Sequence, residues 1–173
     1  DIARVAAVRK AIGDDVALYI DGNYGYYPKQ AIYMAREFEQ YQVGWFEEPV
    51  LADDVAGLAQ IRDATTIPIA TGERLSTKYE FADLLRHQAA SILQMALGRV
   101  GGILEAKKIA GMAEAHYAQI APHLYCGPIE GAANVQISAC SPNFLILESI
   151  LDWSGFHADI LKKPIQWEDG YII

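Results

Sequence analysis

The amino-acid sequence predicts an α/β fold, namely a (β/α) barrel of the TIM type that is incomplete in this chain. Strand-like and helix-like segments alternate along all 173 residues, a pattern typical of a parallel α/β sheet. Each strand-like segment is apolar along its body and finishes in polar residues. These polar ends recur about every 25 residues, which is the length of one βα unit when eight units make a barrel of roughly 250 residues.

The individual elements can be read in order along the chain. An amphipathic segment ends at Gly13, and its apolar phase is already present at Ile2, so we expect the chain to begin inside a helix. Six short apolar runs are then predicted as strands: 16–21, 44–47, 67–73, 91–94, 118–121 and 144–148. Helices are predicted between or beside them at 28–41, 54–64, 79–87, 103–116 and about 132–140.

The polar strand ends define one rim of the predicted barrel. They are Asp21, Glu47, Glu73, the 94–96 region, His123 and Glu148, at steps of 26, 26, about 23, about 27 and 25 residues. In parallel α/β folds the carboxyl ends of the strands lie at a common edge, where the chemistry is placed. Six units rather than eight imply that this chain corresponds to strands 3 to 8, with the first two strands absent.

A doubly wound open sheet is the alternative fold, because it accommodates six strands without truncation. No G-x-G-x-x-G or G-x-x-x-x-G-K-[ST] motif follows any of the predicted strands. Polar residues also end every strand, whereas a doubly wound sheet places its site at one switch point. Both observations favour the barrel.

The composition restricts the class of partner. The formal net charge is −8 and the pI is about 4.9, which argues against a nucleic acid or an anionic membrane surface, since both need a basic face. The only cysteines, Cys126 and Cys140, have neither a zinc-ligand spacing nor the pattern of a disulfide framework. We therefore expect a cytoplasmic protein that acts on a small molecule.

Three acidic residues are the candidate metal ligands. Asp21, Glu47 and Glu73 end successive strands at equal spacing, and carboxylates this close repel one another unless a cation neutralises them. Oxygen ligands without Cys or His select Mg²⁺, with Mn²⁺ possible, over zinc. A single acid of this kind would more simply be a helix cap or a solvated loop residue, but three at equal spacing favour a metal site.

Two further residues qualify this prediction. Adjacent strand residues point to opposite faces, so only one of Glu47 and Glu48 can face the site, and the spacing of 26 residues to both other acids favours Glu47. Asn23 could add an amide that faces the ligand, although a turn role before Gly25 explains it equally well.

One histidine of four lies at a strand end. His123 follows Pro122 after the fifth strand, whereas His87 and His116 lie near helix C-termini, where the helix dipole explains them. His157 has no assignable partner. His123 is therefore the candidate acid/base, with a buried structural histidine as the alternative.

The motifs resemble a known family. They are Asp21-Gly22-Asn23, Trp45-Phe46-Glu47-Glu48-Pro49, Gly72-Glu73-Arg74, the Gly101-Gly102-Ile103 turn and Ala121-Pro122-His123. In this order they resemble the mandelate racemase subgroup of the enolase superfamily, and within it the acid-sugar dehydratases. The resemblance implies that Asp21, Glu47 and Glu73 hold Mg²⁺, which binds the substrate carboxylate and stabilises an enediolate.

The same resemblance assigns the remaining roles. It implies that His123 is the general acid/base, that Glu148 exchanges a hydrogen bond with the intermediate, and that Arg74 faces a substrate oxygen, with an ion pair to a neighbouring acid equally compatible. It also implies a lysine base on a strand before Asp1 and an N-terminal capping domain, both absent from this chain. Residues 1–173 would then be a partial barrel domain whose segment from about 155 to 173 runs toward that capping domain.

One position departs from the family pattern. The family carries an aspartate beside the histidine, one strand earlier, and the matching residue here is Ala96. Because a carboxylate partner fixes the imidazole tautomer and raises its basicity, its loss is expected to lower the pKa of His123 and to loosen its orientation. A proton delivered to a leaving hydroxyl would tolerate this loss better than unaided abstraction of an α proton.

The predicted function is therefore a Mg²⁺-dependent lyase that dehydrates an aldonic or aldaric acid. The alternatives are a racemase, epimerase or cycloisomerase of the same superfamily, and a truncated barrel without catalysis. We also expect a homo-oligomer, because absent strands leave exposed sheet edges that need a partner.

Overall fold

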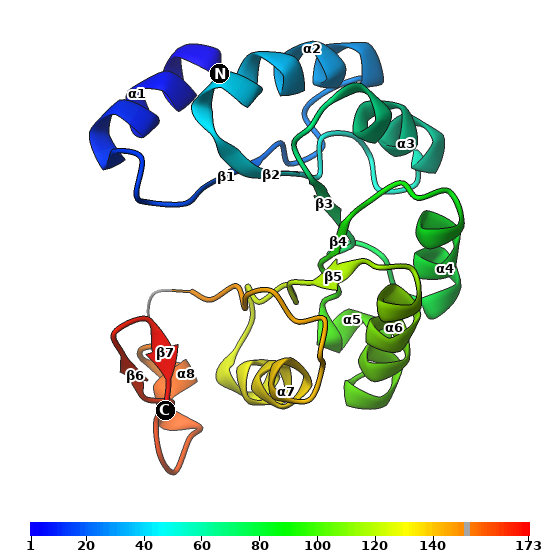
Figure 1. Ribbon diagram of the computed structural model, residues 1–173. Coiled ribbons are helices and arrows are strands. Elements are labelled where there is room, and N and C mark those ends of the chain that lie inside the picture. The colour runs from blue at the N-terminus through cyan, green and yellow to red at the C-terminus, as the bar shows by residue number, and fades with distance from the viewer. Residues whose placement is uncertain (151–152) are drawn as a thin grey trace.

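The computed structural model describes residues 1–150 and 153–173 as an arc of parallel strands lined by helices (Figure 1). The sheet has the order β1-β2-β3-β4-β5, so each strand pairs with the next along the chain. Its strands are β1 (Leu18–Asp21), β2 (Val43–Glu47), β3 (Ile69–Thr71), β4 (Ile92–Leu93) and β5 (Gln119–Ile120). Every pair is parallel, which confirms the predicted partial (β/α) barrel.

Helices between successive strands connect them and lie on the outer side of the arc, whereas the last helix of the chain lies beside the C-terminal hairpin (Figure 1). They are α1 (Ile2–Ile12), α2 (Pro28–Phe38), α3 (Val55–Ala64), α4 (Lys78–Arg86), α5 (Leu97–Val100), α6 (Ile103–Ala115), α7 (Pro128–Ala139) and α8 (Phe156–Asp159). A 3₁₀ turn, η1 (Glu39–Tyr41), continues α2. The predicted helix 28–41 therefore ends as an α-helix at Phe38.

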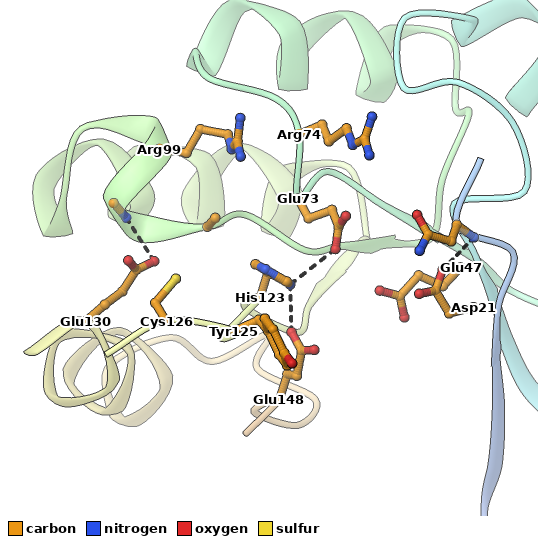
Figure 2. Close-up of a pocket in the computed structure, with 13 residues that line it drawn as sticks. Asp21, Glu47, Glu73, Arg74, Arg99, His123, Tyr125, Cys126, Glu130 and Glu148 are labelled. Atoms are coloured by element: carbon orange, nitrogen blue, oxygen red, sulfur yellow. Dashed lines mark hydrogen bonds and ion pairs between the residues drawn. The ribbon is translucent and has the colours of Figure 1, made fainter. Parts of the chain in front are cut away.

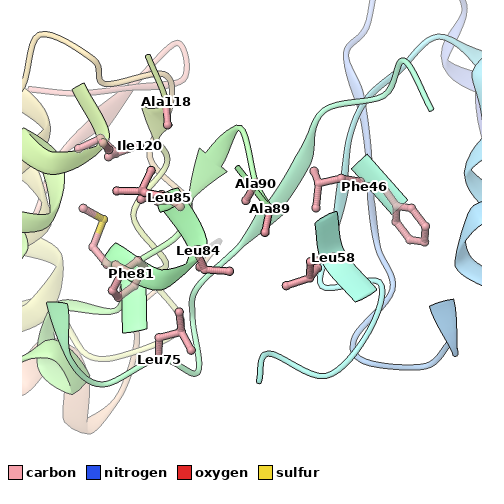
Figure 3. Packing of buried hydrophobic residues seen from close by; sticks show 14 of the residues in the cluster. Phe46, Leu58, Leu75, Phe81, Leu84, Leu85, Ala89, Ala90, Ala118 and Ile120 are labelled. Atoms are coloured by element: carbon pink, nitrogen blue, oxygen red, sulfur yellow. The ribbon is translucent and has the colours of Figure 1, made fainter. Parts of the chain in front are cut away.

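The main core lies between the strands and this outer layer of helices. Phe46 of β2 is fully buried and contacts Phe38 of α2 edge-on, with ring centroids 5.6 Å apart. Phe81 and Leu84 of α4 are also fully buried (Figure 3). Each such side chain contributes roughly 1.5–3 kcal/mol to folding through removal of apolar surface from water.

A second, smaller cluster lies apart from the main core. It comprises Trp45 of β2, Ala70 of β3, Ile92 of β4 and Ala121, the residue that follows β5. Tyr19 of β1 stacks on Trp45, with ring centroids 3.8 Å apart and an interplanar angle of 16°. Because neighbouring strand residues point to opposite faces, Phe46 packs under the helices while Trp45 packs on the other face.

Arg9 fastens the amino ends of the first two strands. This side chain is buried within α1, and its guanidinium donates only to backbone carbonyl groups. The four acceptors are Tyr41 O at 2.9 Å, Gly13 O at 2.7 Å, Val16 O at 2.7 Å and Gln42 O at 3.1 Å. The loops that lead into β1 and β2 are thereby tied to one helix.

The predicted strand at 144–148 is wrong as a regular strand. Only Phe144 bridges to Ile120, and the segment that follows has no regular secondary structure as far as Ile150. Ile120 N donates to Asn143 O at 2.9 Å, and Leu145 N donates to Ile120 O at 2.9 Å. Among the described residues the pairing is confined to these bonds around Ile120, so the segment does not form a regular strand.

One helix begins earlier than predicted, and one short helix was not predicted. The helix expected from about residue 132 begins at Pro128, because proline is well suited to the first helical turn after the cap residue Gly127. The short helix α5 directly after Ala96 was not predicted. Its four residues are too few to produce a helical periodicity in sequence.

The C-terminal segment forms a small unit of its own. It contains α8 and an antiparallel hairpin of β6 (Trp167–Glu168) and β7 (Tyr171–Ile172). Trp153 connects it to the barrel, because its indole N–H donates to Cys126 O at 2.8 Å while its ring lies 6.0 Å from that of Trp167. The relation of this segment to a capping domain stays a prediction.

Within residues 1–150 and 153–173, no helix combines the length and hydropathy that crossing a membrane requires.

Candidate active site at the carboxyl ends of the strands

One open cavity of about 950 Å³ lies at the carboxyl ends of the strands (Figure 2). All seven residues predicted for the site line it: Asp21, Asn23, Glu47, Glu73, Arg74, His123 and Glu148. They come from the ends of β1, β2, β3 and β5 and, for Glu148, from the segment near residue 148. The parallel register brings these strand ends together, since Asp21 is paired with Glu47 and Ala96 with His123.

Asp21 is held by the turn that follows β1. The Asn23 N–H donates to Asp21 Oδ1 at 2.7 Å, and Gly22 N donates to Glu47 O at 2.8 Å. Burial raises the pKa of Asp21, the bond from Asn23 N opposes this, and repulsion by the Glu73 and Glu148 carboxylates raises it further. The Asp21 side chain is therefore in a region of negative potential.

Glu47 and Glu48 point in different directions, as alternation along a strand requires. Glu47 lines the cavity, and its Oε2 accepts from the indole N–H of Trp45 at 3.1 Å. Burial raises the pKa of Glu47, and the nearby carboxylate of Asp21 raises it further. The two acids thus interact across the first two strand ends.

Glu48 is buried behind the rim, with 1% of its surface exposed. Its carboxylate accepts from Gly72 N at 2.8 Å and from the Thr71 hydroxyl at 2.7 Å, both in the next strand and its loop. Burial is the main cause that raises the pKa of Glu48 to about 7, against the lowering effect of these two bonds. Glu48 therefore ties the end of β2 to the backbone that carries Glu73.

Glu73 is contacted from both sides. Its Oε1 accepts a short hydrogen bond from the Tyr24 hydroxyl, and its Oε2 lies 3.2 Å from His123 Nδ1. The guanidinium of Arg74 lies over the Tyr24 ring, with Cζ 3.8 Å from the ring centroid. Burial raises the pKa of Tyr24, and the hydrogen bond to Glu73 raises it further, so this phenol stays protonated.

His123 lies between two carboxylates. Its Nδ1 is 2.7 Å from Glu148 Oε2 and 3.2 Å from Glu73 Oε2 (Figure 2). The same Glu148 oxygen accepts from Leu124 N at 2.8 Å. The imidazole is therefore oriented by the segment that follows β5 and by the loop after β3.

The expectation of a lowered His123 pKa is wrong. Burial would lower this pKa, but the carboxylates of Glu148, Glu73 and Glu47 outweigh burial and raise it. Conversely, burial would raise the pKa of Glu148, but its bonds to His123 and Leu124 N lower it. Ala96 carries no charge at the position where the family has an aspartate. Glu148, which comes later in the sequence than His123, supplies a carboxylate to the imidazole instead.

The donor set fits a hard divalent cation in its chemistry. Asp21, Glu47 and Glu73 offer only carboxylate oxygens to the cavity, which suits Mg²⁺ or Mn²⁺. Across the part of the chain that the structure describes, no three His, Cys, Asp or Glu side chains form a ready-made ligand cluster. Each of the three acids accepts a hydrogen bond from a different donor, namely Asn23 N, the Trp45 indole and the Tyr24 hydroxyl.

The other end of the cavity contains residues that the sequence patterns did not identify: Gly98, Arg99, Tyr125, Cys126 and Glu130. Glu130 Oε1 accepts from Gly98 N at 3.0 Å, which connects α7 to α5. These residues lie several positions beyond a strand end, in loops and first helical turns. Their positions shortly after a predicted strand could have identified them from the sequence, because the loops that follow the strands line the rim of a barrel.

The fold and this rim define a class: a sector of a (β/α) barrel with a cavity of carboxylates and one histidine at the carboxyl ends of its strands. The chain belongs to the enolase C-terminal domain-like family, whose model matches residues 1–173. This confirms the family resemblance of the sequence motifs.

Three similar proteins illustrate the relationship. The chain is 42% identical over 170 residues to an L-talarate/galactarate dehydratase of Salmonella typhimurium, covering 98% of this chain and 40% of the relative. A mandelate racemase/muconate lactonizing enzyme from Sulfitobacter sp. has a TM-score of 0.92 at 48% identity, over 99% of this chain and 43% of that one. The 3,6-anhydro-D-galactonate cycloisomerase from Zobellia galactanivorans has a TM-score of 0.92 at 35% identity, over 99% and 49%. The chain thus spans less than half the length of each.

Proposed function

We propose that this chain carries the catalytic rim of a Mg²⁺-dependent dehydratase that removes water from an aldonic or aldaric sugar acid. The observation that supports this most strongly is the opening of three carboxylates and His123 into one cavity. The similarity to an L-talarate/galactarate dehydratase supports the choice of a sugar acid as substrate. The substrate would be a small carboxylate.

In this proposal Asp21, Glu47 and Glu73 are the metal ligands, with Mn²⁺ as an alternative to Mg²⁺. When bound, the ion would supply the positive charge needed by the substrate carboxylate and by the enediolate formed from it. The raised pKa values of Asp21 and Glu47 fit this role, because a cation would relieve the repulsion that contributes to both shifts.

His123 would donate a proton to the departing hydroxyl group of the substrate. Its Nδ1 faces Glu148 and Glu73, so the ring is held in one orientation, which general acid catalysis requires. Glu148 would orient His123 and exchange a hydrogen bond with the enediolate. The Glu148 side chain remains accessible enough for this, since 39% of it is exposed.

Asn23 and Arg74 would bind the substrate. Both line the same cavity as the acids, and in the described part of the chain Arg74 is held over the Tyr24 ring rather than in an ion pair with a neighbouring carboxylate. A guanidinium in this position can donate to substrate hydroxyl or carboxylate oxygens. The carboxyamide of Asn23 would contact a hydroxyl group nearby.

The experiment is to incubate the complete protein with a panel of aldonic and aldaric acids and Mg²⁺, and to assay for 2-keto-3-deoxy products. A dehydratase gives such a product with at least one acid and loses it on addition of EDTA. If neither a product nor exchange of the α proton with solvent D₂O is detected for any acid, the proposal is refuted. The remaining hypothesis is then a truncated barrel without catalytic activity.

An isomerase is the second candidate, favoured by the similarity to the 3,6-anhydro-D-galactonate cycloisomerase. It would use the same carboxylates and His123 to exchange a proton at the α carbon without loss of water. Incorporation of deuterium from D₂O without a keto-deoxy product would favour this alternative.

A cytoplasmic location fits the same proposal. Cys126 and Cys140 are both free thiols, as expected in a reducing compartment. Assembly as a homo-oligomer stays a prediction, which size-exclusion chromatography with light scattering of the complete protein would test.

A further inference from the structure

Tyr24 uses the two ends of its side chain for two different contacts at the rim. Its hydroxyl donates to Glu73 Oε1, and its ring carries the Arg74 guanidinium at 3.8 Å from Cζ to the ring centroid. Glu73 is a proposed metal ligand and Arg74 a proposed substrate contact, yet Tyr24 itself has no role in the mechanism above. Sequence patterns did not identify this residue.

The backbone fixes the direction of this side chain. Tyr24 has φ of +62°, in the left-handed region that residues other than glycine rarely adopt. Its N–H donates to Glu48 O at 2.8 Å, and Gly25 N donates to Gly22 O at 2.9 Å. Because tyrosine has only two side-chain torsions, a fixed backbone leaves the ring few orientations.

We propose that Tyr24 is a positioning residue with two separable roles: its hydroxyl orients Glu73 toward the cation, and its ring holds Arg74 over the cavity. The inference rests on the proposed metal site and assigns a residue that supports it.

The first role follows from the chemistry of carboxylate ligands. A ligating carboxylate is commonly hydrogen-bonded by an outer partner, and loss of that partner costs about 10- to 100-fold in metal affinity. Tyr24 donates to one oxygen of Glu73, so the bond fixes the carboxylate plane while the second oxygen, Oε2, points toward His123. A phenol is neutral, so it orients Glu73 without adding a charge that would oppose the cation.

The second role follows from the contact between the ring and the guanidinium. A guanidinium over an aromatic face is attracted to the negative potential of the ring face. This attraction restricts the long side chain of Arg74, which is otherwise exposed to solvent. Less side-chain entropy is then lost when Arg74 binds an anionic or hydroxyl group of the substrate.

Two substitutions separate these roles in the complete protein. Tyr24→Phe removes the hydroxyl and keeps the ring, whereas Tyr24→Leu removes both. Isothermal titration calorimetry with MgCl₂ measures the Kd for Mg²⁺ and so tests the first role. The upfield ring-current shift of the Arg74 side-chain protons in NMR spectra tests the second. Neither measurement needs a substrate or turnover.

Tyr26→Phe is a matched control two residues along the chain. The Tyr26 hydroxyl also donates to a carboxylate, Asp1 Oδ2 at 2.8 Å, but Tyr26 does not line the cavity. We expect Tyr24→Phe to raise the Kd for Mg²⁺ about 10-fold and Tyr26→Phe to leave it unchanged. We expect the Arg74 shift to persist in Tyr24→Phe and to vanish in Tyr24→Leu.

The possible failures are distinguishable. If the unaltered protein does not bind Mg²⁺, both the proposed metal site and the orienting role of Tyr24 are refuted. If the unaltered protein binds Mg²⁺ and Tyr24→Phe binds it equally well, the orienting role of the hydroxyl is refuted while the metal site stands. An unchanged Arg74 shift in Tyr24→Leu would refute the role of the ring.

Discussion

The two halves of the rim are built differently. In the half formed by β1, β2 and β3, backbone pairing sets the positions of the acids, since Asp21 is paired with Glu47 and Glu48 binds the backbone beside Glu73. In the other half, β4 and β5 have two residues each. An isolated bridge to Ala96 places the backbone of His123, and the carboxylates of Glu148 and Glu73 orient its ring. The comparison teaches that the proposed metal ligands depend mainly on sheet register, whereas the orientation of the proposed acid depends on contacts with two carboxylates.

The largest effect is expected where the proton is transferred. His123→Asn should reduce turnover by about 10²- to 10⁴-fold, the usual contribution of a general acid or base. The Kd for Mg²⁺ should rise by no more than about 10-fold, the cost of one outer contact, because His123 lies 3.2 Å from Glu73 Oε2 but is not itself a proposed ligand. Steady-state kinetics and calorimetry on the same preparation test this division. An equal loss of metal affinity would mean that the two halves do not act separately.

A core substitution compares the folding contributions of the two halves. Phe46→Ala should lower the free energy of unfolding by about 3–5 kcal/mol, because Phe46 is fully buried under β2. Leu145→Ala, in the segment after β5, should cost less than about 1.5 kcal/mol, because 39% of Leu145 is exposed. Urea denaturation of the complete protein measures both. Equal losses would contradict the view that the second half is less tightly packed.

Metal binding tests the first half directly. Glu47→Gln keeps the shape of the side chain but removes its charge, so the Kd for Mg²⁺ should rise about 100-fold, at or above the cost of losing an outer partner. Glu114→Gln, on the exposed face of α6, is the charge-matched control and should bind Mg²⁺ normally. Undiminished Mg²⁺ affinity in Glu47→Gln would refute the ligand assignment.

The smallest effect concerns the amino ends of the strands. Hydrogen bonds from Thr66 N and the Thr65 and Thr66 hydroxyls lower the pKa of Glu39. A lowered pKa in the folded state means that Glu39 stabilises the protein above its unfolded pKa of about 4.5 and that this stability is lost as pH falls through the folded value. Thermal unfolding from pH 7 to pH 3 should therefore show a slightly shallower decline in Tm for Glu39→Gln. A steeper decline would reverse the sign of this contribution.

The barrel fold and the proposed metal ligands could be predicted from sequence because both follow from periodicity. A βα unit has a nearly constant length, so acids 26 residues apart necessarily reach equivalent strand ends. The choice between Glu47 and Glu48 needed only the alternation of side chains along a strand. The structure buries Glu48 and places Glu47 in the cavity, although their functions stay predictions.

The environment of His123 could not be predicted in the same way. The family pattern predicts the partner of His123 on the preceding strand, where Ala96 has no charge. The compensating carboxylate comes from Glu148 in the following segment. Tyr24 could not be identified from the sequence because its proposed role depends on a left-handed backbone conformation, which leaves no periodic pattern in the sequence. Side-chain convergence from turns is a property of three-dimensional geometry rather than of spacing.

The turn residues of the rim carry a further consequence. Asn23, Tyr24 and Glu48 all have positive φ values, of 42°, 62° and 36°, and a backbone bond from Tyr24 N to Glu48 O connects two of them. Each such conformation costs of order 1–3 kcal/mol, so part of the folding free energy is invested in the shape of the pocket before any ligand arrives. Substitutions that relax this backbone would raise the free energy of unfolding but leave the pocket less preorganised for its ligand. Thermal stability and catalysis would therefore trade off at these positions.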